Sequence, residues 1–270
     1  MISGPIGRFV AHLRDRVARG LLRVGVRPNH VTIAGMVMTV AAGVAIAAGR
    51  AWWPLAFVLV LGSGACDILD GAVAHVGRLT SRFGGVLDSV CDRVADGALL
   101  LGPAMYYVRQ PDAPPGTAPN LTLVLLAGAA LVWAYLTSYT RARAEDVSIE
   151  CTGGFWQRGE RVVTVLLGVL FGHVATAVWI LGLWPLATVG NRLWCVRRAS
   201  RLMDEGRTPS PEDLEPRGVL GVVLWRYRRG SLAFDLHAGL VIALLIVLEY
   251  LVCLEPFDPL GRWACVSGGK

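Results

Sequence analysis

Charged side chains are scarce in this sequence. Asp, Glu, Lys and Arg together make up 17% of its 270 residues, whereas 54% of the residues are hydrophobic and the mean hydropathy is positive. Soluble domains rarely contain several near-continuous apolar runs of about 18 or more residues, the length that crosses a bilayer as a helix. The composition therefore argues against a water-soluble domain and predicts an all-α integral membrane protein.

The apolar runs predict the number of membrane spans. The run at 161–195 has 35 residues, too many for one span of about 20 residues. Gly172 and His173 inside it predict a tight hairpin between two helices, of which the first is short. We therefore expect about seven spans, from apolar runs at 31–49, 51–66, 86–108, 120–139, 161–195 and 236–254.

Lysine is nearly absent, since 25 of the 26 basic residues are arginine and the exception is Lys270. With a cytoplasmic N-terminus, 21 of the 26 fall on the inner side of the membrane, within 8–27, 78–82, 141–161 and 192–229. This positive-inside bias sets the orientation of the chain. It also accounts for the net charge of +6 without a nucleic-acid-binding surface.

No CxxC pair occurs among the six cysteines. A metal or dithiol motif is therefore not indicated. Four of the six lie in or beside predicted helices, so we expect buried free thiols. The cysteines are at positions 66, 91, 151, 195, 253 and 265.

Residues 1–30 lack the apolar core of a cleavable signal peptide. On a helix at 5–24, arginines lie on one face and apolar side chains on another. We expect this helix to lie on the inner membrane surface, where anionic headgroups attract arginine. Pro28 and Asn29, in RPNHVT, predict the start of the first span. The apolar face consists of Phe9, Val10, Leu13, Val17, Leu21 and Leu22.

The stretch CDILDGAVAHVGRLTSRFGGVLDSVCDRVADG, at 66–97, places acids between apolar runs. Asp67 and Asp70 are three residues apart, and Asp88 and Asp92 are four apart, so each pair shares a helix face. An acid at mid-bilayer costs about 2.5–3.5 kcal/mol, and repulsion between close neighbours adds on the order of 4 kcal/mol. Hard divalent cations offset this cost, and oxygen ligands favour magnesium, calcium or manganese over zinc.

A simpler interpretation of any one acid is a helix-end salt bridge with a nearby arginine. It does not explain four acids in register with glycines, of which Gly71 would let phosphates approach the backbone closely. Asp96 continues the row one turn deeper, where we expect it to support the ligands or to cap a helix. The arginines concerned are Arg78, Arg82 and Arg93.

The acidic stretch resembles a known signature. It reads Asp67-x-x-Asp70-Gly71-x-x-Ala74-His75, followed by Gly84-x-x-x-Asp88-x-x-x-Asp92. This pattern closely resembles that of the CDP-alcohol phosphatidyltransferases, in which arginine stands where this chain has His75. The resemblance covers about residues 5–200. It implies a six-helix membrane core with an N-terminal interfacial helix.

This resemblance divides the chain into four parts. They are an interfacial helix at 1–30, a catalytic core at 31–197, a cytoplasmic polar loop at 198–235, and an extra transmembrane helix with a tail at 236–270.

The resemblance also implies a two-metal site. Asp67, Asp70, Asp88 and Asp92 would bind two Mg²⁺ or Mn²⁺ ions, and Asp92 would take the proton from an acceptor hydroxyl. His75 is a weaker, pH-dependent phosphate ligand than arginine, so a neighbouring arginine would take over that role. The residues against a CDP-diacylglycerol-like lipid would be Gly71, Ala74, His75, Arg78, Arg82 and Gly84.

The segment SYTRARAEDVSIECTGGFWQRGER, at 138–161, resembles the inositol-phosphate-using branch of the family. Arg192 matches a later basic position, and Gln157 and Gly159 replace the glutamate and proline of that branch. The residues that match within the segment are Arg141, Arg143, Glu145, Glu160 and Arg161. Because arginine binds phosphate bidentately, the expected reaction transfers a phosphatidyl group to a phosphorylated polyol, inositol phosphate, and releases CMP. The alternatives are glycerol phosphate as acceptor, a catalytically impaired paralogue, or arginines that serve only as positive-inside anchors.

Two other classes fit less well. A UbiA-type prenyltransferase needs a second aspartate-rich motif, and the later aspartates here are isolated. A magnesium transporter leaves the glycine-spaced signature unexplained. We therefore expect a bacterial cytoplasmic membrane enzyme with its active site facing the cytoplasm. Its partners would be the donor lipid, the acceptor, membrane lipids and a second copy of the chain, without nucleic acid.

Overall fold

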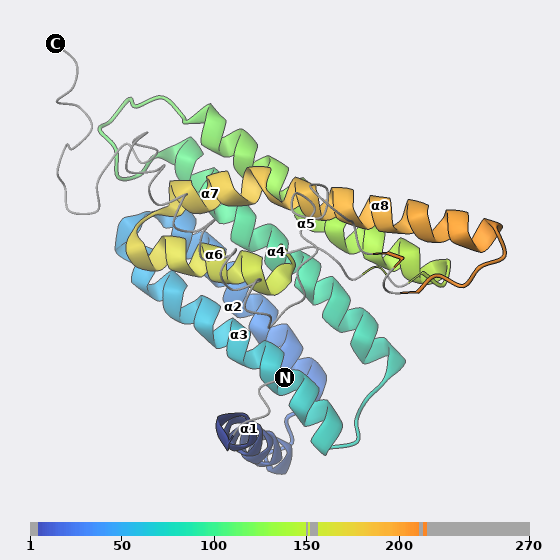
Figure 1. Ribbon diagram of the computed structural model, residues 1–270. Helices are drawn as coiled ribbons and strands as arrows, with labels where there is room; N and C mark the ends of the chain where they lie inside the picture. The colour runs from blue at the N-terminus through green and yellow to red at the C-terminus, as the bar shows by residue number, and fades with distance from the viewer. Residues whose placement is uncertain (1–4, 150, 152–155, 211–212, 215–270) are drawn as a thin grey trace. The chain divides into compact units, whose positions relative to one another are not determined.

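The computed structural model describes residues 5–149, 151, 156–210 and 213–214 (Figure 1). The described residues form helices, turns and loops, with no strand among them. The chain divides into two compact units, with the boundary between Pro119 and Asn120. The all-α class predicted from the sequence is thus confirmed for this part of the chain.

The first unit is built around helix α2 (Pro28–Ala48), which begins where the RPNHVT segment predicts. Helix α2 packs against both α3 (Trp53–Val76) and α4 (Arg82–Arg109). A single 3₁₀ turn, η1 (Arg50–Trp52), connects α2 to α3. A short turn connects α3 to α4, so α2 holds together the two helices that carry the acidic stretch.

Glycines let α2 and α4 come into backbone contact. A Cβ added at Gly102 of α4 would lie 2.6 Å from the carbonyl oxygen of Gly43 on α2. A Cβ at Gly43 would in turn overlap the backbone of Ala98. Small residues at helix crossings are the usual way in which membrane helices pack closely.

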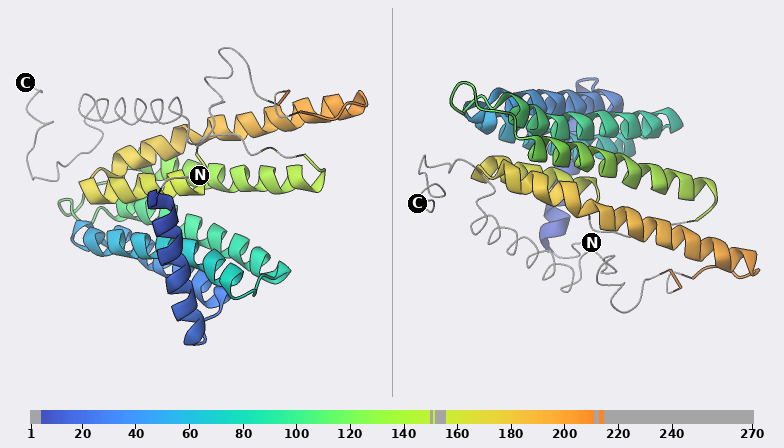
Figure 2. Two further views of the ribbon diagram at one scale, coloured as in Figure 1. Left: turned by 60° about the horizontal axis from the view of Figure 1, so that its bottom comes forward. Right: turned by 90° about the horizontal axis from the view of Figure 1, so that it is seen from above.

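Helix α1 (Pro5–Arg23) runs across the direction of α2 and α3 (Figure 2, left). Its Ala18, fully buried, packs against Ala72 and Val73 near the end of α3. The helix predicted at 5–24 is confirmed as a helix, and its location on a membrane surface stays a prediction.

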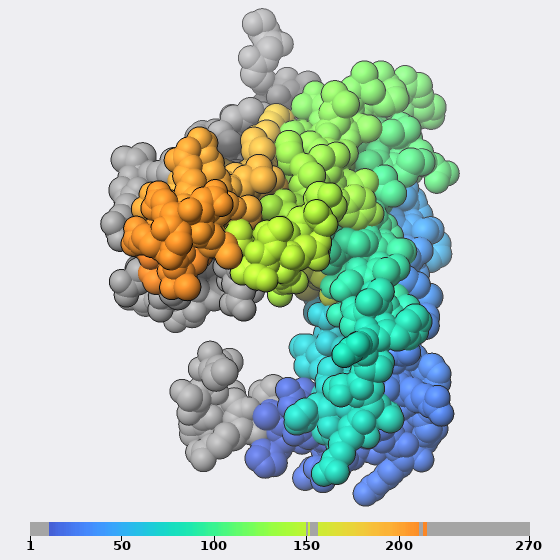
Figure 3. Space-filling model, turned by 90° about the vertical axis from the view of Figure 1, so that its right-hand side faces the viewer, coloured from blue at the N-terminus to red at the C-terminus, as the bar shows by residue number. Residues whose placement is uncertain are grey.

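The second unit contains α5 (Leu121–Asp146), α6 (Arg158–Phe171), α7 (Val174–Leu183) and α8 (Pro185–Asp204). Helix α5 packs against α7 and α8, and α6 packs against α7. The last turns of α5 and α8 lie side by side (Figure 3).

The hairpin predicted at Gly172 and His173 is confirmed. Gly172 has a φ of +79°, which favours glycine, and His173 precedes the first residue of α7. Residues 198–204, the beginning of the expected polar segment, are helical and form the end of α8.

Among the described residues, four helical segments are long and apolar enough to cross a membrane: Pro28–Ala48, Arg50–Val76, Leu121–Asp146 and Val174–Asp204. Helix α4 has 28 residues but carries the charges of the acidic stretch, and α6 has only 14 residues. The expected count of seven spans is therefore not confirmed. The expected helix at 236–254 lies outside the described residues.

The prediction of free thiols is wrong for two cysteines. Cys151 and Cys195 form a disulfide with a Cα–Cα distance of 6.1 Å, linking the segment after α5 to α8. The bond lies in an apolar cluster with Ala144, Ile149 and Ala199. Cys66 and Cys91 are not part of a disulfide, as predicted; Cys91 is buried, whereas Cys66 is only half-buried. Positions 253 and 265 lie outside the described residues.

Thiol mapping tests the disulfide. Protein purified without reductant, denatured and alkylated should carry label on Cys66 and Cys91, whereas Cys151 and Cys195 should take up label only after reduction. Peptide mass spectrometry measures the label at each position. Equal labelling of all four without reductant would show that the bond does not form.

Candidate metal centre and its surroundings

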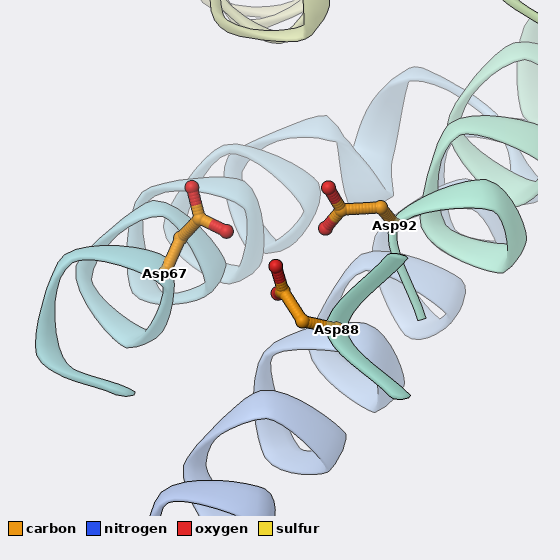
Figure 4. A group of neighbouring side chains, drawn as sticks. All are labelled: Asp67, Asp88 and Asp92. Carbon is orange, nitrogen blue, oxygen red and sulfur yellow. The ribbon is translucent and has the colours of Figure 1, made fainter. Parts of the chain in front are cut away.

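Three acids of the first unit point toward a common point (Figure 4). Asp67 comes from α3, while Asp88 and Asp92 lie one turn apart on α4. One carboxylate oxygen of each lies within 4.8 Å of the other two. The i, i+4 spacing on α4 and the short turn after α3 produce this arrangement, because both helices pack on α2.

Three carboxylates this close repel one another strongly. Arg93 offsets part of the charge, since its Nη2 lies 3.6 Å from Asp92 Oδ2. Asp67 is exposed and the other two acids are half-buried, so a ligand can approach from the open side. An all-oxygen, anionic ligand set of this kind suits Mg²⁺ or Mn²⁺ rather than zinc. The residues present therefore fit a hard divalent cation.

Asp70 is not a member of this group of three. Its Oδ2 accepts a hydrogen bond of 2.8 Å from Thr32 Oγ1 on α2, and its Oδ1 accepts one of 2.5 Å from the Gly71 backbone N–H. The structure thus brings together three of the four predicted ligands and places the fourth against α2. Thr32 was not among the residues predicted for the site.

The residues predicted to contact the donor lipid surround the turn between α3 and α4. The turn closes with a hydrogen bond of 2.9 Å from the Leu79 N–H to the Ala74 carbonyl, and Arg78 adopts a positive φ of 52°. His75 is exposed in the last turn of α3, and Arg82 is the first residue of α4. These positions belong to one structural feature, as the motif predicts.

Two glycines of the motif differ in their surroundings. A Cβ at Gly71 would meet nothing within 4 Å, so its backbone is open to a ligand. A Cβ at Gly84 would come within 3.0 Å of Ser81 Oγ, the hydroxyl that caps α4 by accepting from the Gly84 N–H. Gly71 therefore leaves room for a ligand close to the backbone, whereas Gly84 leaves room for the Ser81 hydroxyl that caps α4.

Asp96 lies in the middle of α4 with 3% of its surface exposed. This position excludes a cap on α4 itself. Asp96 lies one turn beyond Asp92, where it could hold the neighbouring metal ligands in position, as expected from the sequence.

The three arginines predicted to bind an acceptor phosphate all lie in the second unit. Arg141 and Arg143 are exposed near the end of α5, in ion pairs of 2.8 Å with Glu145 and 2.7 Å with Asp146. The third, Arg192 of α8, is buried and donates from Nη1 to the carbonyl oxygen of Thr137 on α5. Its surroundings thus differ from those of the other two.

A second buried arginine was not among the predicted binding residues. Arg161 of α6 is 3% exposed and donates from Nη1 to the Trp156 carbonyl at 3.2 Å. The Trp156 N–H donates in turn to Thr188 Oγ1 on α8, at 3.3 Å. The signal for Arg161 was present in the sequence, since it lies in the same segment, 138–161, as the predicted arginines.

A family model for the CDP-alcohol phosphatidyltransferases matches residues 26–190, and the chain belongs to this family. It is therefore an integral membrane transferase. The phosphatidylinositol phosphate synthase of Mycobacteroides abscessus is 33% identical over 212 residues, covering 75% of this chain and 92% of that protein. The archaetidylinositol phosphate synthase of Methanothermobacter thermautotrophicus is 34% identical over 169 residues, covering 63% and 75%.

Solved structures show the same likeness. The phosphatidylinositol phosphate synthase of Mycobacterium tuberculosis with CDP-DAG bound superposes with a TM-score of 0.62 at 28% identity, covering 77% of this chain and 100% of that one. A complex of that enzyme with manganese and citrate gives a TM-score of 0.61 at 29% identity, covering 76% and 93%. The fold of this chain is thus the fold of those enzymes.

Removing one carboxylate tests the metal centre. Asp88→Asn should weaken Mn²⁺ binding by at least about tenfold, since even residues that only support metal ligands contribute that much. Titration of purified protein with Mn²⁺, with free ion measured by electron paramagnetic resonance, gives the affinity. Asp204→Asn, at the exposed end of α8, is the matched control and should bind as the parent does. Unchanged binding in Asp88→Asn would contradict the site.

Proposed function

We propose that the protein transfers the phosphatidyl group of a CDP-diacylglycerol-like lipid to a hydroxyl of inositol phosphate and releases CMP. The observation that supports this most directly is the group of Asp67, Asp88 and Asp92, in a chain whose relatives include phosphatidylinositol phosphate synthases. The proposed site faces the cytoplasmic side of a bacterial membrane, with α1 on that membrane surface.

The reaction needs a group that accepts the proton of the attacking hydroxyl and positive charge that stabilises the phosphates. An oxygen of the acceptor attacks the lipid phosphorus, the bond from that phosphorus to CMP breaks, and the hydroxyl proton passes to Asp92. The two divalent cations proposed here, held by the three clustered acids and Asp70, would stabilise the charge on the phosphates. The open backbone at Gly71 and the arginines of the α3–α4 turn, Arg78 and Arg82, would hold the diphosphate.

Inositol phosphate is preferred over glycerol phosphate as the acceptor. The relatives that match over most of their length include a phosphatidylinositol phosphate synthase and an archaetidylinositol phosphate synthase. The proposed phosphate ligands are Arg141, Arg143 and Arg192, to which the buried Arg161 is added because guanidinium groups bind phosphate bidentately. A catalytically impaired paralogue is less favoured, because the three clustered acids are all in place.

An acceptor panel tests this proposal. Purified protein in lipid, supplied with CDP-diacylglycerol and Mg²⁺, should release CMP with inositol phosphate and not with inositol, serine or glycerol phosphate. Chromatography measures CMP, and mass spectrometry identifies the lipid product. Release of CMP with glycerol phosphate alone would replace the proposed acceptor, and no release with any acceptor would favour the impaired paralogue.

The ion pair between Arg143 and Asp146 provides a test of acceptor recognition. Arg143→Ala should raise the KM for inositol phosphate by about 10- to 100-fold, since a hydrogen bond to a charged group contributes about 1.5–3 kcal/mol. Asp146→Asn keeps the arginine and removes only its partner, so the KM should stay near that of the parent. The KM for the CDP-lipid should change in neither variant. If both variants raise the acceptor KM equally, the pair is a structural anchor.

A further inference from the structure

The contact between α2 and α3 repeats along its length at the spacing of a helix face. Three pairs of residues face each other across it, from α2 to α3: Thr32 with Asp70, Gly35 with Cys66, and Thr39 with Ser63. The Thr39 and Ser63 hydroxyl oxygens are 2.6 Å apart, and a Cβ at Gly35 would lie 3.0 Å from the Cys66 Cβ. Two threonines on one helix therefore face α3 in comparable ways, one against a hydroxyl and one against a carboxylate.

The Thr32 hydroxyl has one proton and two acceptors within reach. The Pro28 carbonyl oxygen lies at 3.2 Å, and Asp70 Oδ2 lies at 2.8 Å. The shorter contact joins a hydroxyl to a charged group, which is the stronger kind of hydrogen bond. The proton therefore goes to Asp70. The β-branch of threonine also limits its χ1 angle on the helix to few rotamers, and in the one present here the hydroxyl reaches Asp70.

These bonds fix the carboxylate plane of Asp70 without using up its acceptors. One oxygen accepts from Thr32 and the other from the Gly71 N–H, whereas an ionised carboxylate has about four lone-pair positions. Each oxygen thus keeps capacity for a cation. Asp70 lies three residues after Asp67, one turn along the same face of α3.

We propose that Thr32 is a positioning residue that orients Asp70 as a fourth oxygen ligand beside the cluster of Asp67, Asp88 and Asp92. This inference rests on the proposed metal centre and adds to it a residue of α2, outside the acidic motif. Thr32 touches neither substrate nor metal. Its effect on metal binding passes through Asp70.

The experiment measures Mn²⁺ affinity by electron paramagnetic resonance on purified protein in detergent, without substrates. Thr32→Val should weaken binding by about 10- to 100-fold, the usual effect of removing a group that orients a metal ligand. Thr32→Ser restores the hydroxyl and should bind within a few-fold of the parent. Thr39→Val makes the same change on the same helix contact, away from the acids, and should leave the Mn²⁺ affinity unchanged.

A double-mutant cycle separates an action through Asp70 from a general loosening of α2. In an Asp70→Asn background, Thr32→Val should weaken Mn²⁺ binding no further. Should Thr32→Val not fold, Thr32→Ala removes the same hydroxyl without adding a methyl group.

Three results would overturn the inference. They are parental affinity in Thr32→Val, an equal loss in Thr39→Val, or a full additional loss in the Asp70→Asn background. Absence of Mn²⁺ binding in the parent protein is a different failure, because it would remove the metal centre itself along with the proposal.

Discussion

Mutual repulsion of carboxylates is the constraint on which the first unit depends. Asp67, Asp88 and Asp92 repel one another, because like charges about 4 Å apart at a partly exposed site cost on the order of 4 kcal/mol. Helix α2 opposes this repulsion by packing on α3 and α4 together. Its contact with α4 needs glycine on both sides, and its contact with α3 includes hydroxyl groups. The site is therefore held by a helix that contributes none of the clustered acids.

The arginines of the second unit occur in two environments, exposed and buried. At the end of α5, exposed arginines pair with acids three or four residues away, and such pairs contribute little to stability in water. Arg161 of α6 and Arg192 of α8 are instead buried, and both donate hydrogen bonds to backbone carbonyls. Burial of a guanidinium is costly, so the environment of these two residues differs from that of the exposed arginines at the end of α5.

Helix faces and turns could be predicted from the sequence because they depend on local spacing. The i, i+3 and i, i+4 pairs of acids gave the shared faces, and the Gly172 hairpin followed from the excess length of one apolar run. Contacts between distant segments could not be predicted in this way. Cys151 and Cys195 are 44 residues apart without a motif, and the bond from Thr32 to Asp70 depends on which face of α2 meets α3.

The shortness of α6 has a consequence for the surrounding lipid. Its 14 residues extend about 21 Å, whereas the hydrocarbon layer of a typical bilayer is about 30 Å thick. A helix of this length that starts at one interface ends before the opposite interface. Hydrophobic mismatch of this size is relieved by thinning of the bilayer, by snorkelling of flanking side chains or by oligomerisation. Where the bilayer thins beside α6, shorter acyl chains would fit with less strain.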